Sequence, residues 1–259
     1  MPESLSMSSP ERQERILTLA TQRGRVSVAE LCGYFDISAA TARRDLDALE
    51  GQGKLKRVHG GAIPARHALP EQPILQRSTE QAAEKAGIAQ AAAGLVKGGE
   101  TIFLGSGSTV LALANSLKGH PALTVITNSL PVINTLAGIE DITLIALGGM
   151  LRATELSFIG HITDQALQEV RADRVFIGIH AISVEEGLTN AYLPETLTDR
   201  AILRIGREIV LLADHTKCGQ ISTAFLAPLS SINILITDSQ TPVDFVAAIQ
   251  DKGVQVIVA

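Results

Sequence analysis

From residue 101 to residue 258, short apolar runs alternate with segments of helical periodicity. Runs that are apolar throughout predict strands buried on both faces, and the helices between them predict that the strands pair in parallel. The sequence therefore indicates an α/β fold with a mostly parallel sheet. The expected strands are Thr101–Leu104, Leu123–Thr127, Ile142–Leu147, Arg174–Ile179, Glu208–Ala213, Ile232–Thr237 and Val254–Val258. The expected helices are Glu80–Val96, Thr109–Leu117, Leu130–Ala137, Thr163–Val170, Glu195–Ile205 and Val243–Gln250.

The first expected strand leads through Gly105-Ser106-Gly107-Ser108-Thr109 into a helix. Ligands on parallel sheets bind beyond the carboxyl ends of the strands, so this loop is a candidate binding site. Its glycines let a ligand approach the backbone, and free N–H groups at the helix start attract an anion such as phosphate. It is not a Walker loop, because no Gly-Lys-Ser/Thr follows. A purely structural strand-to-helix turn is the alternative explanation.

Polar residues also follow the later strands. Cationic side chains there can neutralise a phosphate, and amide or carboxylate groups can bond sugar hydroxyls. We expect Arg152 and Lys217 in the first role, and Asn128, Glu195 and Asp214 in the second. For each charged residue the alternative is an ordinary surface ion pair, which is the better explanation for Arg200. The candidate ligand-binding residues are Gly105, Ser106, Gly107, Ser108, Thr109, Thr127, Asn128, Ser129, Gly149, Arg152, Glu195, Asp214 and Lys217.

The stretch from residue 37 to residue 63 predicts a short helix followed by a basic hairpin. Ser38 is a good N-cap, and the chain then has no Pro or Gly until Gly51. Ala42, Leu46 and Leu49 form an apolar stripe at helical spacing. Strand residues Leu55 and Val58 alternate with basic residues before the turn signal Gly60-Gly61. Two further helices, Glu11–Gln22 and Val28–Phe35, are expected before it.

The predicted helix carries Arg43 and Arg44 off its apolar stripe. The major groove of DNA admits one helix, and arginine can donate two hydrogen bonds to a guanine edge, while a basic hairpin can lie along phosphates. The alternative is a solvated helix whose arginines only keep it soluble. The candidate DNA-binding residues are Ser38, Ala39, Thr41, Arg43, Arg44, Lys56, Arg57 and His59.

These N-terminal residues resemble the winged helix-turn-helix of the DeoR family of bacterial transcription regulators. One departure is Ala42, where the family usually has isoleucine. The matching residues are Val26-Ser27-Val28-Ala29-Glu30-Leu31, Phe35, Ser38, Thr41, Arg43-Arg44-Asp45-Leu46, Leu49-Glu50, Gly53, Leu55 and His59-Gly60-Gly61-Ala62.

The remainder resembles the sensor domain of the same family, which is related to sugar-phosphate isomerases. Gly105 stands where that family commonly has aspartate, which affects one expected sugar contact. The matching segments are Ser106–Thr109, Thr127-Asn128-Ser129, Gly148–Arg152, Gly187-Leu188-Thr189 and Asp214–Gly219.

The resemblance implies a repressor of a carbohydrate catabolic operon that leaves its double-stranded operator DNA when it binds a phosphorylated sugar or sugar derivative. It also implies a homodimer or homotetramer in the cytoplasm. An isomerase-type enzyme is the alternative, because the Gly105–Thr109 loop resembles the phosphate loop of ribose-5-phosphate isomerases. That enzyme's Asp-Gly-Ala-Asp-Glu and Lys-Gly-Gly-Gly motifs are absent, however, and Glu195 is the best remaining candidate for the base. A pure dimerisation scaffold leaves the polar strand ends unexplained.

Charge and composition agree with a basic DNA-binding part joined to an acidic body. Residues 1–67 hold 10 basic and 8 acidic residues, against 12 and 19 in the rest. The expected organisation is a disordered tail at 1–10, the winged helix-turn-helix at 11–64, a proline-containing linker at 65–79 and the sensor domain at 80–259. Two cysteines without C-x-x-C spacing exclude a disulfide framework and fit a reducing cytoplasm. No histidine spacing indicates a metal, no cofactor is expected, and no apolar run reaches the roughly 20 residues that cross a membrane.

Overall fold

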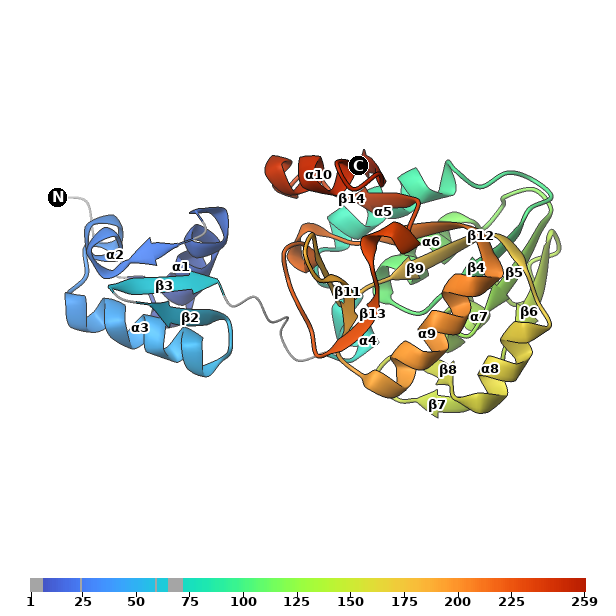
Figure 1. Ribbon diagram of the computed structural model, residues 1–259, viewed down its shortest axis with the longest axis horizontal. Coiled ribbons are helices and arrows are strands. Elements are labelled where there is room, and N and C mark those ends of the chain that lie inside the picture. The colour runs from blue at the N-terminus through green and yellow to red at the C-terminus, as the bar shows by residue number, and fades with distance from the viewer. Residues whose placement is uncertain (1–6, 24, 59, 65–71) are drawn as a thin grey trace. The chain divides into compact units, whose positions relative to one another are not determined.

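The computed structural model describes residues 7–23, 25–58, 60–64 and 72–259. The chain divides into two compact units, the head (Met1–Leu69) and the body (Pro70–Ala259), shown in Figure 1. The expected tail at residues 1–6 and the part of the expected linker at residues 65–71 lie outside the described residues.

The head combines helices with a small antiparallel sheet of strand order β1-β3-β2. Its elements are α1 (Ser9–Arg23), β1 (Val26–Ser27), α2 (Val28–Phe35), α3 (Ala39–Gly51), β2 (Leu55–Val58) and β3 (Gly61–Pro64). α1 begins two residues before the expected start at Glu11. The reason is a local cap, since the N–H and hydroxyl of Ser8 donate to Glu11 Oε2 at 3.1 and 2.8 Å. The expected disorder up to residue 10 is therefore wrong for Ser9 and Pro10, which lie in the first turn, a position that proline favours.

Serine residues begin the other two helices. Ser27 Oγ accepts from the Glu30 N–H at 3.2 Å, and Glu30 Oε2 accepts from the Ser27 N–H at 2.7 Å, which is a capping box. Ser38 Oγ accepts from the Thr41 N–H at 3.1 Å, so the N-cap expected from the sequence is confirmed. Between the helices Asp36 adopts a left-handed conformation with φ of 51°. This residue turns the chain sharply from α2 into α3.

The apolar faces of the three head helices meet in one small core. The stripe expected on α3 is confirmed, because Ala42, Leu46 and Leu49 are at most 1% exposed. They pack with Ile16 of α1 and Leu31 of α2. Since Ala42 is completely buried, the small side chain at the position where isoleucine is usual lies inside this core.

An ion pair between Arg12 and Asp45 joins α1 to α3 beside that core. Arg12 Nε lies 2.6 Å from Asp45 Oδ2, and the carboxylate also accepts from Gln13 Nε2 at 3.1 Å and Ser9 Oγ at 3.2 Å. Burial alone would raise the pKa of Asp45, but these hydrogen bonds outweigh it and hold the pKa below its usual value. The pair therefore holds α3 against α1.

The body is built on a seven-stranded sheet, parallel throughout, of order β15-β14-β12-β9-β4-β5-β6. All the expected strands are present, and their ends differ from expectation by no more than two residues. The strands are β4 (Thr101–Leu104), β5 (Leu123–Thr127), β6 (Ile142–Ala146), β9 (Ala172–Gly178), β12 (Gly206–Leu212), β14 (Ile234–Thr237) and β15 (Gln255–Val258).

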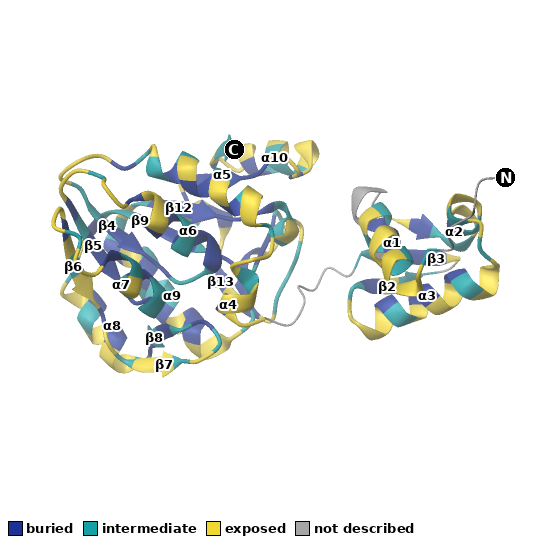
Figure 2. Cartoon of the chain, turned by 180° about the vertical axis from the view of Figure 1, so that it is seen from behind, coloured by how far each residue is buried: buried dark blue, intermediate teal, exposed yellow. Residues whose placement is uncertain are grey.

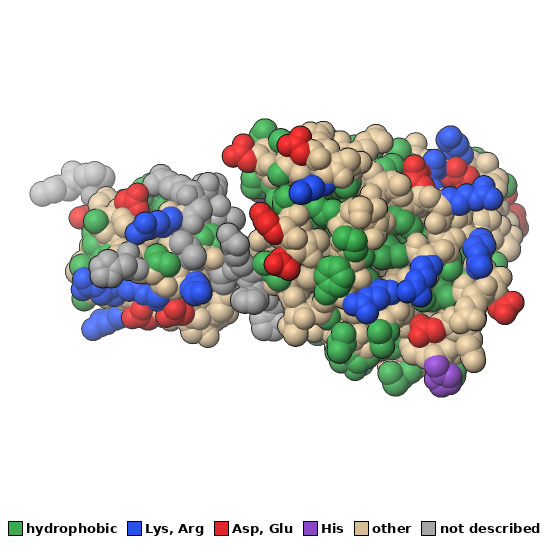
Figure 3. Space-filling view, viewed as in Figure 1, with side chains coloured by type: hydrophobic (Ala, Val, Ile, Leu, Met, Phe, Trp, Pro, Cys, Tyr) green, Lys and Arg blue, Asp and Glu red, His purple; other side chains and the backbone are tan. Residues whose placement is uncertain are grey.

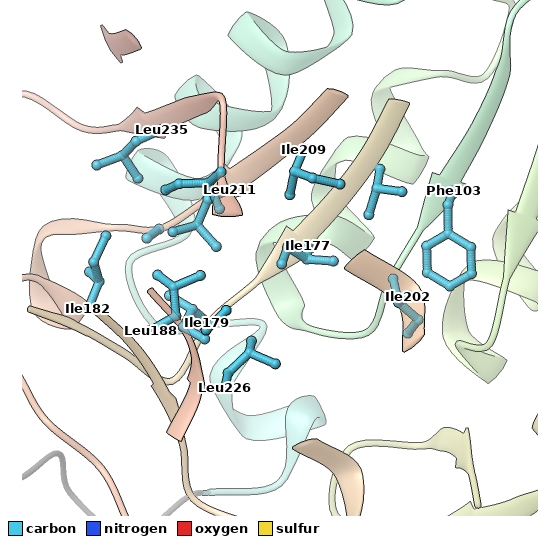
Figure 4. Packing of buried hydrophobic residues seen from close by; sticks show 14 of the residues in the cluster. Phe103, Ile177, Ile179, Ile182, Leu188, Ile202, Ile209, Leu211, Leu226 and Leu235 are labelled. Carbon is cyan, nitrogen blue, oxygen red and sulfur yellow. The ribbon is translucent and has the colours of Figure 1, made fainter. Parts of the chain in front are cut away.

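Helices cover both faces of this sheet, as its apolar strands require. One face packs against α5 (Ala82–Ala93), α6 (Ser108–Ser116) and α7 (Leu130–Leu136). The other packs against α8 (His161–Gln168), α9 (Leu193–Ile205) and α10 (Val243–Gln250). Figure 2 shows the strands buried between exposed outer helix surfaces, and Figure 4 shows Ile202 of α9 among strand residues such as Ile177 and Ile209.

Several short elements were not expected from the sequence. They are the hairpin β7 (Met150–Arg152) and β8 (Ser157–Ile159), the antiparallel sheet β10 (Ala181–Ser183), β11 (Gly187–Asn190) and β13 (Ala224–Ala227), the helix α4 (Ile74–Arg77), and the 3-10 turns η1 (His215–Lys217) and η2 (Leu229–Ser231). Each has only three or four residues, too few for a periodic pattern to be visible.

The expected linker is wrong at its C-terminal end. Ile74 is 1% exposed, and its N–H donates to the Thr154 carbonyl at 2.9 Å. α4 is therefore packed on the body, which begins before the expected residue 80. The prolines at 70 and 73 suggested an extended connection, but Pro73 serves as the N-cap residue of α4.

The strand order reverses between β4 and β9. From β4 the chain adds β5 and then β6 on one side, and it later adds β9, β12, β14 and β15 on the other. The loops after β4 and β9 consequently leave the sheet in opposite directions, which opens a space between them that favours ligand binding. Gly105 and the residues after Gly178 lie at this position, where the Gly105 N–H donates to the Phe176 carbonyl at 2.9 Å.

We predict that Asp45→Asn destabilises the head by about 3 kcal/mol at neutral pH, because it leaves Arg12 without its counter-charge. The pKa of Asp45 is lowered on folding, so the pair stabilises the head above about pH 4 and its contribution is lost as pH falls through the lowered value. Hydrogen exchange of α1 and α3 peptides, compared between wild type and variant at pH 7 and at about pH 3, measures this. Arg15→Met, at an exposed position of α1, is the control. Equal protection of wild type and Asp45→Asn at neutral pH would contradict the prediction.

Candidate functional sites

The exposed face of α3 presents the two arginines that the sequence singled out. Arg43 and Arg44 are exposed, as are Ser38 and Ala39, while the opposite face of the helix is buried in the head core. Ser38 Oγ lies 2.9 Å from Thr41 Oγ1 in addition to capping the helix. The helix therefore offers a polar N-terminal half and a fixed start, the form in which a helix enters the major groove.

The hairpin of β2 and β3 is fastened to α3. Arg57 Nε lies 3.3 Å from Asp47 Oδ1, and the Arg57 N–H donates to Glu50 Oε1 at 2.9 Å. Lys56, its neighbour on β2, is exposed. Arg57 thus positions the hairpin, and its contact with phosphate remains a prediction, as does that of Lys56. His59 lies outside the described residues.

In the body, the loop from Gly105 to Thr109 connects β4 to α6 at the reversal of strand order. Gly107 is the N-cap residue of α6 with φ of 113°, a conformation that favours glycine, and it has no side chain with which to cap the helix. Ser108 and Thr109 are each 7% exposed. Uncapped N–H groups at the start of a helix attract an anion, which is the chemistry expected of this loop.

Gly105 is required for packing as well. A Cβ on it would lie 3.2 Å from Ile177 Cγ2 and 3.3 Å from the Phe176 carbonyl oxygen, closer than most contacts allow. The aspartate that is common at this position therefore has no room here without movement of β9.

The residues after β5 lie beside this loop, because Leu104 pairs with Thr127 in the sheet. Asn128 Nδ2 donates to the Phe158 carbonyl at 2.9 Å, and Thr127 Oγ1 accepts from the Ser129 N–H at 3.0 Å. Two buried atoms, Asn128 Oδ1 and Ser129 Oγ, have no hydrogen-bond partner among the described residues. Buried polar atoms are almost always paired, so these two indicate a place for a polar ligand.

Arg152 and Glu195, both expected to contact a ligand, lie next to each other in the structure. They form an ion pair, Ser157 Oγ donates to Glu195 Oε1 at 2.8 Å, and the Arg152 guanidinium lies 4.6 Å from the centre of the Tyr192 ring. Glu195 thereby ties α9 to the β7–β8 hairpin. The best candidate base from the sequence is thus occupied by a guanidinium and a hydroxyl, an arrangement that suits a structural role better than proton abstraction.

Asp214 and Lys217 lie at the carboxyl end of β12. Asp214 is 1% exposed, and its Oδ1 accepts from the Thr216 N–H at 3.0 Å, which shapes the turn η1. Lys217 is half-buried in that turn. The neighbouring Cys218 is half-buried, and desolvation raises the pKa of its thiol to about 12.

Gly149 has a structural explanation. Its φ is 153°, and a Cβ there would lie 2.1 Å from Thr163 Oγ1, which itself donates to the Gly148 carbonyl at 2.9 Å.

The expectation of an ion pair for Arg200 is wrong: its guanidinium donates to the backbone carbonyls of Phe225 and Leu226.

Sequence reasoning missed three charged residues near the loop. Arg77 of α4 forms an ion pair with Glu155, and Lys85 of α5 donates its ammonium protons to the carbonyls of Arg77 and Glu80. Lys85 is 5% exposed, and its burial lowers its pKa, although the nearby Asp214 opposes this. A signal was available, because Lys85 continues the buried stripe of Ile88, Ala89 and Ala92. A lysine on such a stripe needs a specific partner.

Within the described residues, no group of three or more His, Cys, Asp or Glu side chains is placed to hold a metal ion. In the same part of the chain, no helix has both the length and the apolar character needed to cross a membrane.

The family model for the DeoR-like helix-turn-helix domain matches residues 12–67, and that for the DeoR C-terminal sensor domain matches residues 80–239. The HTH-type transcriptional regulator GolR of Listeria innocua is 36% identical over 249 residues, which cover 96% of this chain and 98% of that protein. The glycerol-3-phosphate regulon repressor of Escherichia coli is 34% identical over 253 residues, with 96% and 98% covered.

The chain belongs to the DeoR family. The resemblance found in the sequence is thus confirmed, with its winged helix-turn-helix and mostly parallel α/β sensor domain. A DeoR-family chain with this head is a DNA-binding transcription regulator and not an enzyme. Ribose 5-phosphate isomerase A of Methanocaldococcus jannaschii is similar in structure over 51% of this chain and 52% of its own, with a TM-score of 0.38 and 22% identity. So remote a likeness bears on neither substrate nor reaction.

We predict that Arg43→Ala and Arg44→Ala each weaken binding to the preferred DNA site. An arginine that reads a base is worth roughly 1–3 kcal/mol, and its loss also relaxes sequence preference. Lys56→Ala should weaken binding to all sequences alike, because a contact to phosphate carries no sequence information. Gel-shift titrations on a site selected from random duplex DNA, and on a scrambled duplex, measure both effects. Wild-type affinity in both arginine variants would refute a reading role for this face of α3.

Proposed function

We propose that the protein is a repressor of a carbohydrate operon, and that a phosphorylated sugar or sugar derivative releases it from operator DNA in the bacterial cytoplasm. The sensing part of the proposal is supported by the start of α6, which a glycine N-cap residue leads at the reversal of strand order. Two unpartnered polar atoms, Asn128 Oδ1 and Ser129 Oγ, lie on the neighbouring strand end. The names of two relatives agree with this class, since one is the glycerol-3-phosphate regulon repressor and another the lactose phosphotransferase system repressor of Streptococcus mutans.

In this proposal the phosphate binds the N–H groups of α6 together with the hydroxyls of Ser108 and Thr109. Lys217, in the turn η1 after β12, contributes positive charge to the same end of the sheet. The sugar part faces the ends of β5 and β12, where Asn128 and Asp214 offer hydrogen-bonding groups. Arg152 and Glu195 shape the site from the β7–β8 hairpin, because each already has the other as its partner.

The mechanism is linkage between two binding sites on one chain. Effector and operator each favour a different arrangement of the protein, so binding of one weakens binding of the other. A coupling free energy of about 1–3 kcal/mol changes operator affinity roughly 5- to 150-fold, which is enough to switch a promoter.

We further propose that two bodies associate through an exposed apolar surface on α9 and β13. Leu193 and Leu197 lie one turn apart on α9 and are 59% and 55% exposed, and Phe225 of β13 is 50% exposed. Arg200, one turn further along α9, reaches the Phe225 carbonyl and so joins the two elements. Figure 3 shows hydrophobic side chains gathered over this part of the body. Exposed apolar patches mark association sites, and a head that reads a few base pairs needs a symmetric second copy.

We predict that Ser108→Ala and Thr109→Ala yield repressors that stay on the operator in the presence of effector. Each change deletes a donor to a charged oxygen, worth about 1.5–3 kcal/mol, and leaves the head unaltered. Lys217→Ala should act in the same direction but less strongly. Operator affinity with and without a panel of sugar phosphates measures this, with Ser231→Ala in η2 as a control away from the loop. If both loop variants respond at the wild-type concentration of effector, the phosphate binds elsewhere.

We predict that Leu197→Glu converts the full-length oligomer to a monomer at micromolar concentration, because a charge cannot be buried in an apolar interface without a partner. Light scattering gives the mass. Val243→Glu on α10, where valine is 82% exposed, is the matched control and should leave the mass unchanged. A wild-type chain that is itself monomeric would rule out this interface.

A further inference from the structure

The start of α6 already has an anion next to it. Glu155, in the turn between β7 and β8, is 4% exposed, and its Oε1 lies 3.7 Å from the position that a Cβ on Gly107 would take. Its other oxygen, Oε2, forms the ion pair with Arg77. A carboxylate near a helix N-terminus is favourable, so Glu155 lies where the phosphate of an effector would be attracted.

A phosphate cannot approach this helix start while Glu155 remains there, because two anions in a buried site repel each other strongly. Arg77 is the group that both anions can use. Its guanidinium forms charge-assisted hydrogen bonds with carboxylate and phosphate alike, and it stays charged in either case.

A second observation supports a polar ligand near the same hairpin. Asn128 and Ser129 are each 1% exposed, and each has one buried oxygen atom without a partner among the described residues. Ser129 forms a backbone bridge with Ser157, and the Asn128 carbonyl accepts from the Phe158 N–H at 2.8 Å. Both unpartnered atoms are therefore next to the hairpin that carries Glu155.

We propose that Arg77 binds the phosphate group of the effector, and that Glu155 holds the same guanidinium until the effector displaces it. This inference rests on the proposed function and names a further cation of that site, Arg77, which the candidate residues from the sequence did not include. The ligand class is a phosphate monoester, since the helix start, the hydroxyls and one guanidinium together match three acceptor oxygens.

The exchange also connects the site to the chain that precedes the body. Three contacts hold α4 in place: the Arg77–Glu155 ion pair, the Ile74 N–H on the Thr154 carbonyl at 2.9 Å, and Lys85 on the Arg77 carbonyl. Two of them come from the same turn of the β7–β8 hairpin. When phosphate takes Arg77, that turn loses its charged contact with α4, the first element after residues 65–71.

The test uses the full-length chain and inorganic phosphate, with chloride at equal ionic strength as the reference. Binding is measured by titration calorimetry and by thermal shift for wild type, Glu155→Gln, Arg77→Gln and Arg77→Lys. Glu155→Gln should bind phosphate about ten- to a hundredfold more tightly than wild type, because it removes the competing charge. Arg77→Gln should bind it more weakly by a similar factor, and Arg77→Lys should be intermediate.

Matched controls separate this exchange from loss of stability. Glu208→Gln breaks another ion pair, with Arg174, at the amino ends of β12 and β9. Arg207→Gln removes an exposed cation at the same end of β12. Both should bind phosphate as wild type does. If the Arg77–Glu155 pair has only a structural role, Glu155→Gln should bind phosphate more weakly than wild type. Weaker, unchanged or absent phosphate binding in Glu155→Gln therefore overturns the proposal.

Gel shifts on the same variants keep this proposal distinct from the proposed function. If wild type binds its operator and responds to a sugar phosphate while Arg77→Gln and Glu155→Gln respond identically, only the exchange is refuted. If wild type neither binds a selected DNA site nor responds to any sugar phosphate, the proposed function fails instead.

Discussion

The parallel pairing of β4 with both β5 and β9 is the constraint on which the body depends. Because β4 lies inside the sheet, between β5 and β9, and the chain proceeds to one side of it and then to the other, the loops after β4 and β9 diverge. That divergence puts the glycine-rich loop, the polar end of β5 and the start of α6 around one location. The pairing with β9 also explains Gly105, because a Cβ there would lie 3.2 Å from Ile177 Cγ2 and 3.3 Å from the Phe176 carbonyl oxygen, so that β9 would have to shift to admit a side chain.

The sequence was sufficient to predict the regular part of the fold. Strands such as Thr101–Leu104 and Leu123–Thr127 are continuous apolar runs, and burial on both faces leaves a pattern that a single sequence displays. The β7–β8 hairpin and the β10-β11-β13 sheet left no such pattern, because their strands are short and their pairing is set by contacts distant in the chain. α4 was missed because prolines suggest extension, whereas burial of Ile74 decided the outcome.

The candidate site was predicted less completely than the fold, for a physical reason. Glycines and hydroxyls after a strand are local signals, so the loop at 105–109 was found. The partners in an ion pair can lie far apart in the sequence, so a local pattern does not reveal them. Arg152 was expected to face a ligand but pairs with Glu195, and Arg77 pairs with the distant Glu155. Asp45 shows the same limit in the head, since the helix pattern placed it next to two exposed arginines and did not reveal its pairing with Arg12.

The contacts of Arg57 with α3 have a consequence for how the head meets DNA. With Asp47 holding its guanidinium and Glu50 its backbone N–H, the hairpin and α3 keep one register before any DNA is present. The conformational entropy of fixing the wing is then lost when the head folds and not when the complex forms. A preorganised pair of elements loses less conformational entropy when it binds DNA. It also fits only those DNA sites whose groove and backbone match the fixed arrangement of α3 and the hairpin.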